Sequence, residues 1–144
     1  MCHYADSSFL VSCYLTDTNS PRAKTYLLGA SVPLVFTALQ SLEVRNSFHL
    51  GVFRGLFSAS EATSARANLE LDLQSGRLVK KTVKWPLAFR IASHLSQGHS
   101  AMVGTRSLDV LHVAAAKTLR AKVFVSFDDR QRKLAAAVGL TVVP

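Results

Sequence analysis

Lys122-Val123-Phe124-Val125-Ser126-Phe127-Asp128 is the stretch that most clearly predicts the fold. A short apolar run rich in β-branched and aromatic residues is typical of a strand that is covered on both faces. Helical patterns flank it: an Ala- and Leu-rich run over residues 108–120, and a second run over residues 130–138 that stops at Gly139. The sequence therefore predicts helix, strand and helix in succession, as in a parallel sheet.

Working outward from this stretch, strands and helices alternate along the chain. Strands are expected over residues 2–5, 32–36, 78–83, 122–127 and 141–143. Helices are expected over residues 8–16, 21–30, 38–50, 59–75, 85–98, 108–120 and 130–138. This alternation predicts an α/β fold, a three-layer α/β/α sandwich with a mainly parallel central sheet. We expect residues 1–144 to form a single domain.

Several helix boundaries in this prediction rest on one or two residues. Asn19-Ser20-Pro21 offers a capping side chain followed by Pro at the first helical position. Ser107 is expected to cap the helix over residues 108–120, and Gly98 is expected to end the helix that starts at Trp85-Pro86.

Composition narrows the class of protein. The chain has 144 residues, of which 49% are hydrophobic and 18% are charged, which excludes a disordered chain. Seventeen Lys and Arg against nine Asp and Glu give a formal net charge of +8, which suits a polyanionic partner. Two cysteines, Cys2 and Cys13, provide neither a disulfide framework nor a zinc-ligand spacing.

No segment has the pattern of a signal peptide or a membrane anchor. The longest uncharged stretch, residues 25–42, is interrupted by Gly29 and Pro33 and by polar residues. We therefore expect a cytoplasmic protein without a membrane partner.

Eight of the nine acidic residues fall into two groups that differ in their surroundings. Asp17, Glu61, Glu70 and Asp72 lie in polar stretches and are expected on the solvated surface. Asp6, Glu43 and Asp109 lie inside or beside apolar runs, and Asp128 follows the expected strand over residues 122–127. Ionised carboxylates in apolar surroundings are costly unless they are paired or bind a metal. The second group is therefore expected to converge in one site.

The expected elements place two of these acids together. Asp6 and Asp128 both follow expected strands, so they would lie at the same edge of a parallel sheet. Asp109 sits in the first turn of its helix, and Glu43 about two turns into its own. An all-oxygen cluster is the ligand set that Mg²⁺ or Mn²⁺ prefers.

Each of these acids also has a local interpretation. Asp6 and Asp128 could cap the helices that follow them, and Asp109 could favour the positive end of a helix dipole. Glu43 could pair with a basic residue such as Arg45. One shared site accounts for all four acids at once.

Four stretches resemble the motifs of PIN-domain ribonucleases, specifically the VapC-type toxins of prokaryotic toxin–antitoxin pairs. They are Tyr4-Ala5-Asp6-Ser7-Ser8-Phe9-Leu10-Val11, Ser41-Leu42-Glu43-Val44-Arg45-Asn46, residues 104–114 around Ser107-Leu108-Asp109, and residues 125–131 around Ser126-Phe127-Asp128-Asp129. The resemblance spans nearly the whole chain, and the motifs occur in the family's order.

The resemblance implies a PIN-like fold and metal-dependent endoribonuclease activity. The implied catalytic acids are Asp6, Glu43, Asp109 and Asp128, of which Asp6, Asp109 and Asp128 would hold Mg²⁺ or Mn²⁺. Water attack on the RNA phosphodiester would leave a 5′-phosphate and a 3′-hydroxyl. A homodimer and a cognate antitoxin that blocks the site are implied as well.

Further residues near the motifs are candidates for auxiliary roles. Ser8 and Ser126 could orient a carboxylate or a water, and Asp129 places a second acid beside Asp128. The candidate RNA-binding residues are Arg45, Arg106 and Arg130, although Arg45 and Arg106 could equally pair with the acids.

Two other functions fit the same residues. A PIN-domain nuclease could process RNA without being a toxin, and a PIN-like module could bind RNA without cutting it; the presence of all four acids argues against the second. An apolar cluster is either core or a surface for the antitoxin or a second copy: Leu50, Phe53, Leu56 and Phe57.

Overall fold

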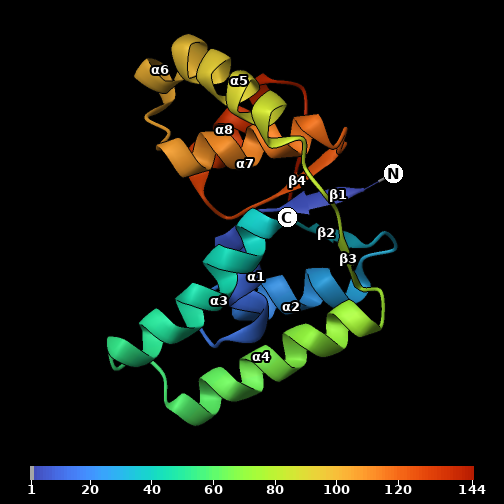
Figure 1. Cartoon of the computed structure of the whole chain (residues 1–144), viewed down its shortest axis with the longest axis vertical. Coiled ribbons are helices and arrows are strands. Elements are labelled where there is room, and N and C mark those ends of the chain that lie inside the picture. Colours follow the sequence, from blue (N-terminus) through green and yellow to red (C-terminus); the bar gives the residue numbers. More distant parts are fainter. Residues whose placement is uncertain (1) are drawn as a thin grey trace. The chain divides into compact units, whose positions relative to one another are not determined.

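The computed structural model describes residues 2–144, and these residues divide into two compact units (Figure 1). Unit 1 comprises residues 2–6 and 82–144, and unit 2 comprises residues 7–81. The expectation of a single domain over residues 1–144 stays a prediction. No helix within residues 2–144 is long and apolar enough to cross a membrane.

Unit 1 contains three parallel strands and the helices that follow them. Strand β4 (Val123–Val125) lies between β1 (His3–Ala5) and β5 (Thr141–Val143), and Phe124 pairs with Tyr4 on one side and Val142 on the other. The helical segments are α5 (Trp85–Leu95), η1 (Ser96–Ser100), α6 (Ala101–Val103), α7 (Ser107–Thr118) and α8 (Asp129–Ala137).

The core of unit 1 explains why β4 and α7 are so apolar. Every residue from 109 to 116 of α7 is buried, and α5 runs alongside α7 (Figure 1). The fully buried ring of Tyr4 stacks on Phe124, with ring centroids 5.8 Å apart. A hydrogen bond of 2.8 Å joins the Tyr4 hydroxyl to His112 Nδ1, which satisfies two buried polar groups on β1 and α7.

Unit 2 packs four helices around two parallel strands. The helices are α1 (Ser7–Tyr14), α2 (Ser20–Gly29), α3 (Ala38–Phe53) and α4 (Ala59–Gln74). Strands β2 (Leu34–Phe36) and β3 (Leu78–Lys80) pair through Leu34 and Leu78. Thr37 and Gln40 form a capping box at the start of α3, which stops the chain from extending β2.

Three helix boundaries differ from the sequence-based prediction. Helix α2 starts at Ser20; Asn19 before it makes no side-chain cap, and the Ser20 hydroxyl donates to the Leu15 carbonyl. Helix α7 starts at Ser107 itself and is preceded by Arg106, whose backbone N–H donates to the Asp109 carboxylate. Gly98 does not end a helix, since it lies inside the π-helical turn η1.

Strand β4 is also shorter than expected. It ends at Val125, so Ser126 and not Asp128 is the first residue beyond the strand. The Ser126 backbone N–H still donates to the Val143 carbonyl, at 3.0 Å. The side chain at the end of β4 is therefore a hydroxyl, and Asp128 is placed by the turn that follows it.

The expectation that Asp72 lies on the solvated surface is wrong. Asp72 on α4 is 9% exposed, and its carboxylate forms an ion pair with Arg77 and accepts a 2.8 Å hydrogen bond from the Tyr14 hydroxyl. Burial and this hydrogen bond raise the pKa of Tyr14 far above its usual range. Asp72 therefore joins α1 to α4 inside unit 2.

Candidate functional site

A buried acid and a buried hydroxyl lie at the ends of two neighbouring strands of unit 1. Asp6 directly follows β1, and Ser126 directly follows β4. Both residues have no exposed surface, and the Ser126 hydroxyl donates a hydrogen bond to Asp6 Oδ2. The backbone N–H of Asp6 donates to the Val125 carbonyl at 3.0 Å. This pairing holds the Asp6 carboxylate in one orientation where the parallel strands end.

The same hydroxyl connects Asp6 to Asp128. Ser126 Oγ accepts a 3.0 Å hydrogen bond from the backbone N–H of Asp128. Asp128 Oδ1 accepts a 2.9 Å hydrogen bond from the Gln131 N–H, so Asp128 caps α8. Arg132 donates to the Ser126 carbonyl at 2.7 Å and so closes this turn, a role that the sequence analysis did not assign.

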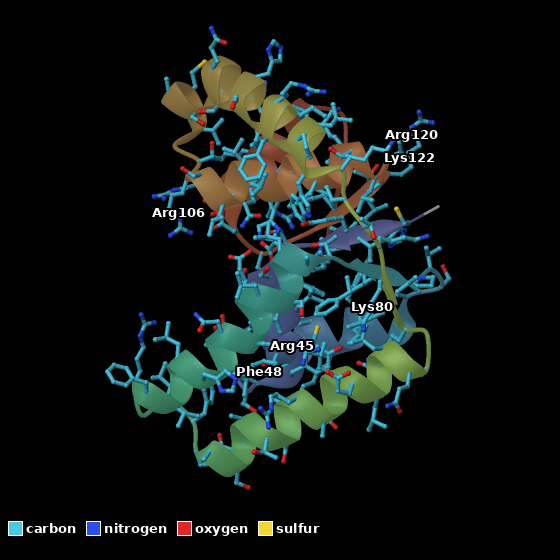
Figure 2. The ribbon with its side chains drawn as sticks, viewed as in Figure 1. Arg45, Phe48, Lys80, Arg106, Arg120 and Lys122 are labelled. Atoms are coloured by element: carbon cyan, nitrogen blue, oxygen red, sulfur yellow. The ribbon has the colours of Figure 1, made fainter. Side chains whose placement is uncertain are left out.

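Asp109 lies in the first turn of α7 and is 5% exposed. Its Oδ2 accepts hydrogen bonds of 3.1 Å from the backbone N–H and from the side-chain Nε of Arg106. The Arg106 side chain itself is largely exposed, and Figure 2 shows it at the start of α7. The hydrogen bond to Asp109, followed by the charge of Asp109 and then that of Asp128, raises the pKa of Arg106. Arg106 is therefore a cation that both acids attract.

Glu43 belongs to unit 2 and lies on α3. Glu43 Oε1 accepts a 3.1 Å hydrogen bond from the Ser7 hydroxyl, and Ser7 is the next residue after Asp6 in the chain. Arg45 pairs with Glu70 at 2.6 Å and also donates to Ser41 Oγ (Figure 2).

The remaining candidate residues are distributed over both units. Ser8 is an exposed residue of α1 in unit 2. Asp129 and Arg130 are exposed in the first turn of α8 in unit 1. Unit 1 thus holds three of the four candidate acids, together with Ser126, Arg106 and these two neighbours of Asp128.

The chemistry of these side chains fits a hard divalent cation, because carboxylate and hydroxyl oxygens are the ligands that Mg²⁺ and Mn²⁺ prefer. Within residues 2–144, however, no three His, Cys, Asp or Glu side chains lie close enough together to form a group that could hold a metal ion. Asp109 faces Arg106, and Asp128 faces the start of α8. A bound cation would therefore have to compete with these two partners.

Comparison with known proteins identifies one family model that matches most of the chain. The family model described as "PIN domain" matches residues 4–137. None of the curated proteins matches the sequence.

Three solved structures are similar to the chain over 99% of its length. VapC20 of Mycobacterium tuberculosis, described as a sarcin-ricin loop cleaving toxin, is 17% identical, covered over 99% of its chain, with a TM-score of 0.69. VapBC2 of Rickettsia felis, bound to a promoter DNA fragment, is 13% identical, covered over 98%, with a TM-score of 0.66. FitAcB of Neisseria gonorrhoeae is 16% identical, covered over 96%, with a TM-score of 0.64. At these identities the likeness establishes the fold, and the expected α/β class with parallel strands is confirmed.

Proposed function

Because the chain belongs to the PIN domain family, we propose that it is a metal-dependent endoribonuclease and the toxin of a type II toxin–antitoxin pair. The observation that carries this proposal is the chain of contacts in unit 1 that runs from Asp6 through Ser126 to Asp128, with Asp109 and Arg106 beside it. A buried carboxylate fixed by a hydroxyl at the end of parallel strands is typical of a catalytic site and is costly as mere structure.

Asp6, Asp109 and Asp128 are the residues that we propose hold Mg²⁺ or Mn²⁺. When bound, such a cation lowers the pKa of water and shields the charge that develops on the phosphoryl oxygens. Ser126 is a positioning residue in this proposal, because its hydroxyl orients Asp6 while its oxygen fixes the backbone at Asp128.

In this proposal Arg106 contacts the RNA, and Glu43 acts at the metal or on the attacking water. The Arg106 guanidinium would exchange its contact with Asp109 for a phosphate oxygen, since its side chain is largely exposed. Glu43, which accepts a hydrogen bond from Ser7 within unit 2, is proposed as a further metal ligand or as the group that positions the attacking water. Water adds to phosphorus, the bond from phosphorus to the 3′ oxygen breaks, and that oxygen takes up a proton. The products are a 5′-phosphate and a 3′-hydroxyl.

The charge of the chain supports a nucleic-acid substrate. With a net charge of +8, the protein attracts a polyanion, and the exposed Arg130 beside Asp128 would contact a phosphate. Arg45 is proposed as a weaker contact, because its guanidinium is engaged by Glu70. Asp129 is proposed as an auxiliary acid at the same turn, Ser8 as an auxiliary hydroxyl on α1, and the cytoplasm as the compartment.

An exposed apolar cluster in unit 2 supports a protein partner. Phe53 is 87% exposed and Leu56 is 66% exposed, next to the exposed Leu50 and the half-buried Phe57. Large apolar side chains gathered on a surface are typical of an interface. We propose that a cognate antitoxin or the second subunit of a homodimer covers this cluster.

The test is cleavage of total RNA by the purified protein, with Mg²⁺ or Mn²⁺ and with EDTA. We expect discrete products that carry 5′-phosphates, that require the metal, and that are absent with Asp6→Ala and Asp109→Ala. Glu61→Ala, an exposed acid at the start of α4, is the control that should cleave normally.

Growth of bacteria that express the chain gives the matching result in cells. Expression of the wild type should stop growth, and expression of Asp109→Ala should not. Cleavage without growth arrest would favour a processing nuclease over a toxin. RNA binding without any cleavage would overturn the nuclease proposal and favour a binding module.

A further inference from the structure

A cavity of about 560 Å³ lies within unit 1, between the segment formed by α5 and η1 and the start of α7. Its lining combines three large apolar side chains with three polar ones: Phe89, Leu108 and Leu111, and Ser93, Ser96 and Gln97. None of the residues that line it is charged. Cavities of this volume that combine apolar walls with a few polar groups are typical of small-ligand sites.

The cavity lies against the helical turn that carries Asp109, one of the candidate catalytic acids. Thr105 and Ser107, on either side of Arg106, line the cavity, and Leu108 in its wall directly precedes Asp109. Arg106 and Asp109 do not themselves line the cavity, so the first turn of α7 carries Asp109 on one face and part of the cavity lining on another. A ligand held in the cavity would contact the same helical turn that carries Asp109.

Two of the polar lining residues, Ser96 and Gln97, belong to an unusual element. Residues 96–100 form the π-helical turn η1, and π-helical turns are frequent at functional sites. Ser100 Oγ lies 2.9 Å from Thr105 Oγ1, which fastens η1 to the loop before α7. Ser93, Ser96 and Gln97 are all exposed, so their hydroxyl and amide groups are open to a ligand.

We propose that this cavity holds one unpaired nucleobase of the RNA at the first turn of α7; the proposal rests on the nuclease function proposed above. A nucleobase is flat, uncharged and edged with hydrogen-bond donors and acceptors. Phe89, which is 58% exposed, offers its ring as a stacking surface. Gln97 offers a hydrogen-bond donor and an acceptor for the edge of the base.

Other ligand chemistries fit the walls less well. A phosphate or an acidic peptide needs basic groups, and the lining has none. A purely apolar ligand would cover the serine hydroxyls and the glutamine amide without giving them hydrogen bonds. A base that stacks on an apolar side chain and hydrogen-bonds to a polar one leaves neither kind of group unsatisfied, and the cavity would select which base it holds.

The test is nucleotide binding in EDTA, where no cleavage takes place. The probes are the four nucleoside 5′-monophosphates, with ribose 5-phosphate as the base-free control, and the readout is the NMR shift of the Gly98 amide in η1. We expect at least one nucleotide to bind, and ribose 5-phosphate not to bind. Removing the stacking ring with Phe89→Ala should weaken binding about 5- to 150-fold.

Two further variants keep the test specific. Ser93→Trp places a large side chain in the cavity and should block binding, whereas Met102→Ala removes a residue that is 91% exposed and outside the lining, and should bind normally. Equal binding of ribose 5-phosphate, or binding that survives both cavity variants, would overturn the base pocket even if the wild type cleaves RNA.

The pocket and the nuclease function can fail separately. Base binding to a protein that never cleaves RNA would overturn the nuclease proposal and leave the pocket supported. If no nucleotide binds, and Phe89→Ala instead changes the sedimentation coefficient of the protein, a second copy of the chain occupies this surface and the base pocket is wrong.

Discussion

At the scale of single residues, one hydroxyl organises two of the candidate acids. Ser126 Oγ donates to Asp6 and accepts from the Asp128 N–H, and both of its contacts are inside unit 1. Ser126→Ala removes this connection and leaves a buried carboxylate with one partner fewer. We expect Mn²⁺ affinity to fall about 10- to 100-fold, as is typical when a group that orients a metal ligand is lost.

Two matched variants show whether Ser126 acts by positioning. Thr118→Ala removes another hydroxyl of unit 1, one that only donates to the Ala114 carbonyl within α7, and should leave Mn²⁺ affinity unchanged. Ser126→Thr keeps the hydroxyl and should restore most of the affinity. Wild-type Mn²⁺ affinity in Ser126→Ala would show that the hydroxyl has no part in the site.

The residue scale also shows what could be predicted from the sequence. Asp6 could be placed because a strand of apolar residues ends directly before it. Asp72 was misplaced because its partners, Tyr14 and Arg77, come together only when α1 packs near α4. A polar stretch indicates a surface segment, but it does not reveal which of its side chains turns inward to form a pair.

At the scale of elements, the buried end of α1 makes the stability of unit 2 depend on pH. Burial, followed by the nearby charge of Asp72, raises the pKa of the Cys13 thiol from 9.0 to about 12. Between these values the unfolded chain releases a proton that the folded chain keeps. Stability is therefore complete below about pH 9 and decreases as the pH rises toward 12, by up to about 1.4 kcal/mol per pH unit for this group.

Denaturant unfolding at pH 8, 9, 10 and 11 measures this loss. Cys13→Ala should flatten the decline, whereas Cys2→Ala, which changes the half-buried thiol, should keep the wild-type profile. The raised pKa of Tyr14 adds a loss of the same sign above pH 10. A free energy of unfolding that stays constant from pH 8 to pH 11 would contradict the assigned burial of Cys13.

The elements themselves were predicted more reliably than their ends. Apolar periodicity is a property of many residues, and within residues 2–144 it located each strand, and each α-helix other than the short α6, to within a few positions. The ends depend on single hydrogen bonds, such as that of Arg106 N–H to Asp109. The π-helical turn at residues 96–100 has no such periodic signal, because it differs from an α-helix only in which backbone groups pair.

At the scale of the whole molecule, the fold class could be predicted from the alternation of strands and helices. That alternation predicted an α/β protein, and the family match covers residues 4–137. The polyanionic partner that the net charge of +8 suggests stays a prediction. The sequence could not predict which cations face the acids, because both Arg45 and Arg106 lie near motif acids along the chain. Only the fold separates them: Arg106 pairs with Asp109, and Arg45 pairs with Glu70.

The central claim is that Asp6, Asp109 and Asp128 together hold the divalent cation that cleavage requires. The measurement that tests it most directly is a Mn²⁺ titration followed by electron paramagnetic resonance, on the wild type, Asp109→Asn and the surface control Glu61→Gln. We expect the wild type and Glu61→Gln to bind Mn²⁺ alike, and Asp109→Asn to lose that binding. Equal Mn²⁺ affinity in all three proteins would contradict the account.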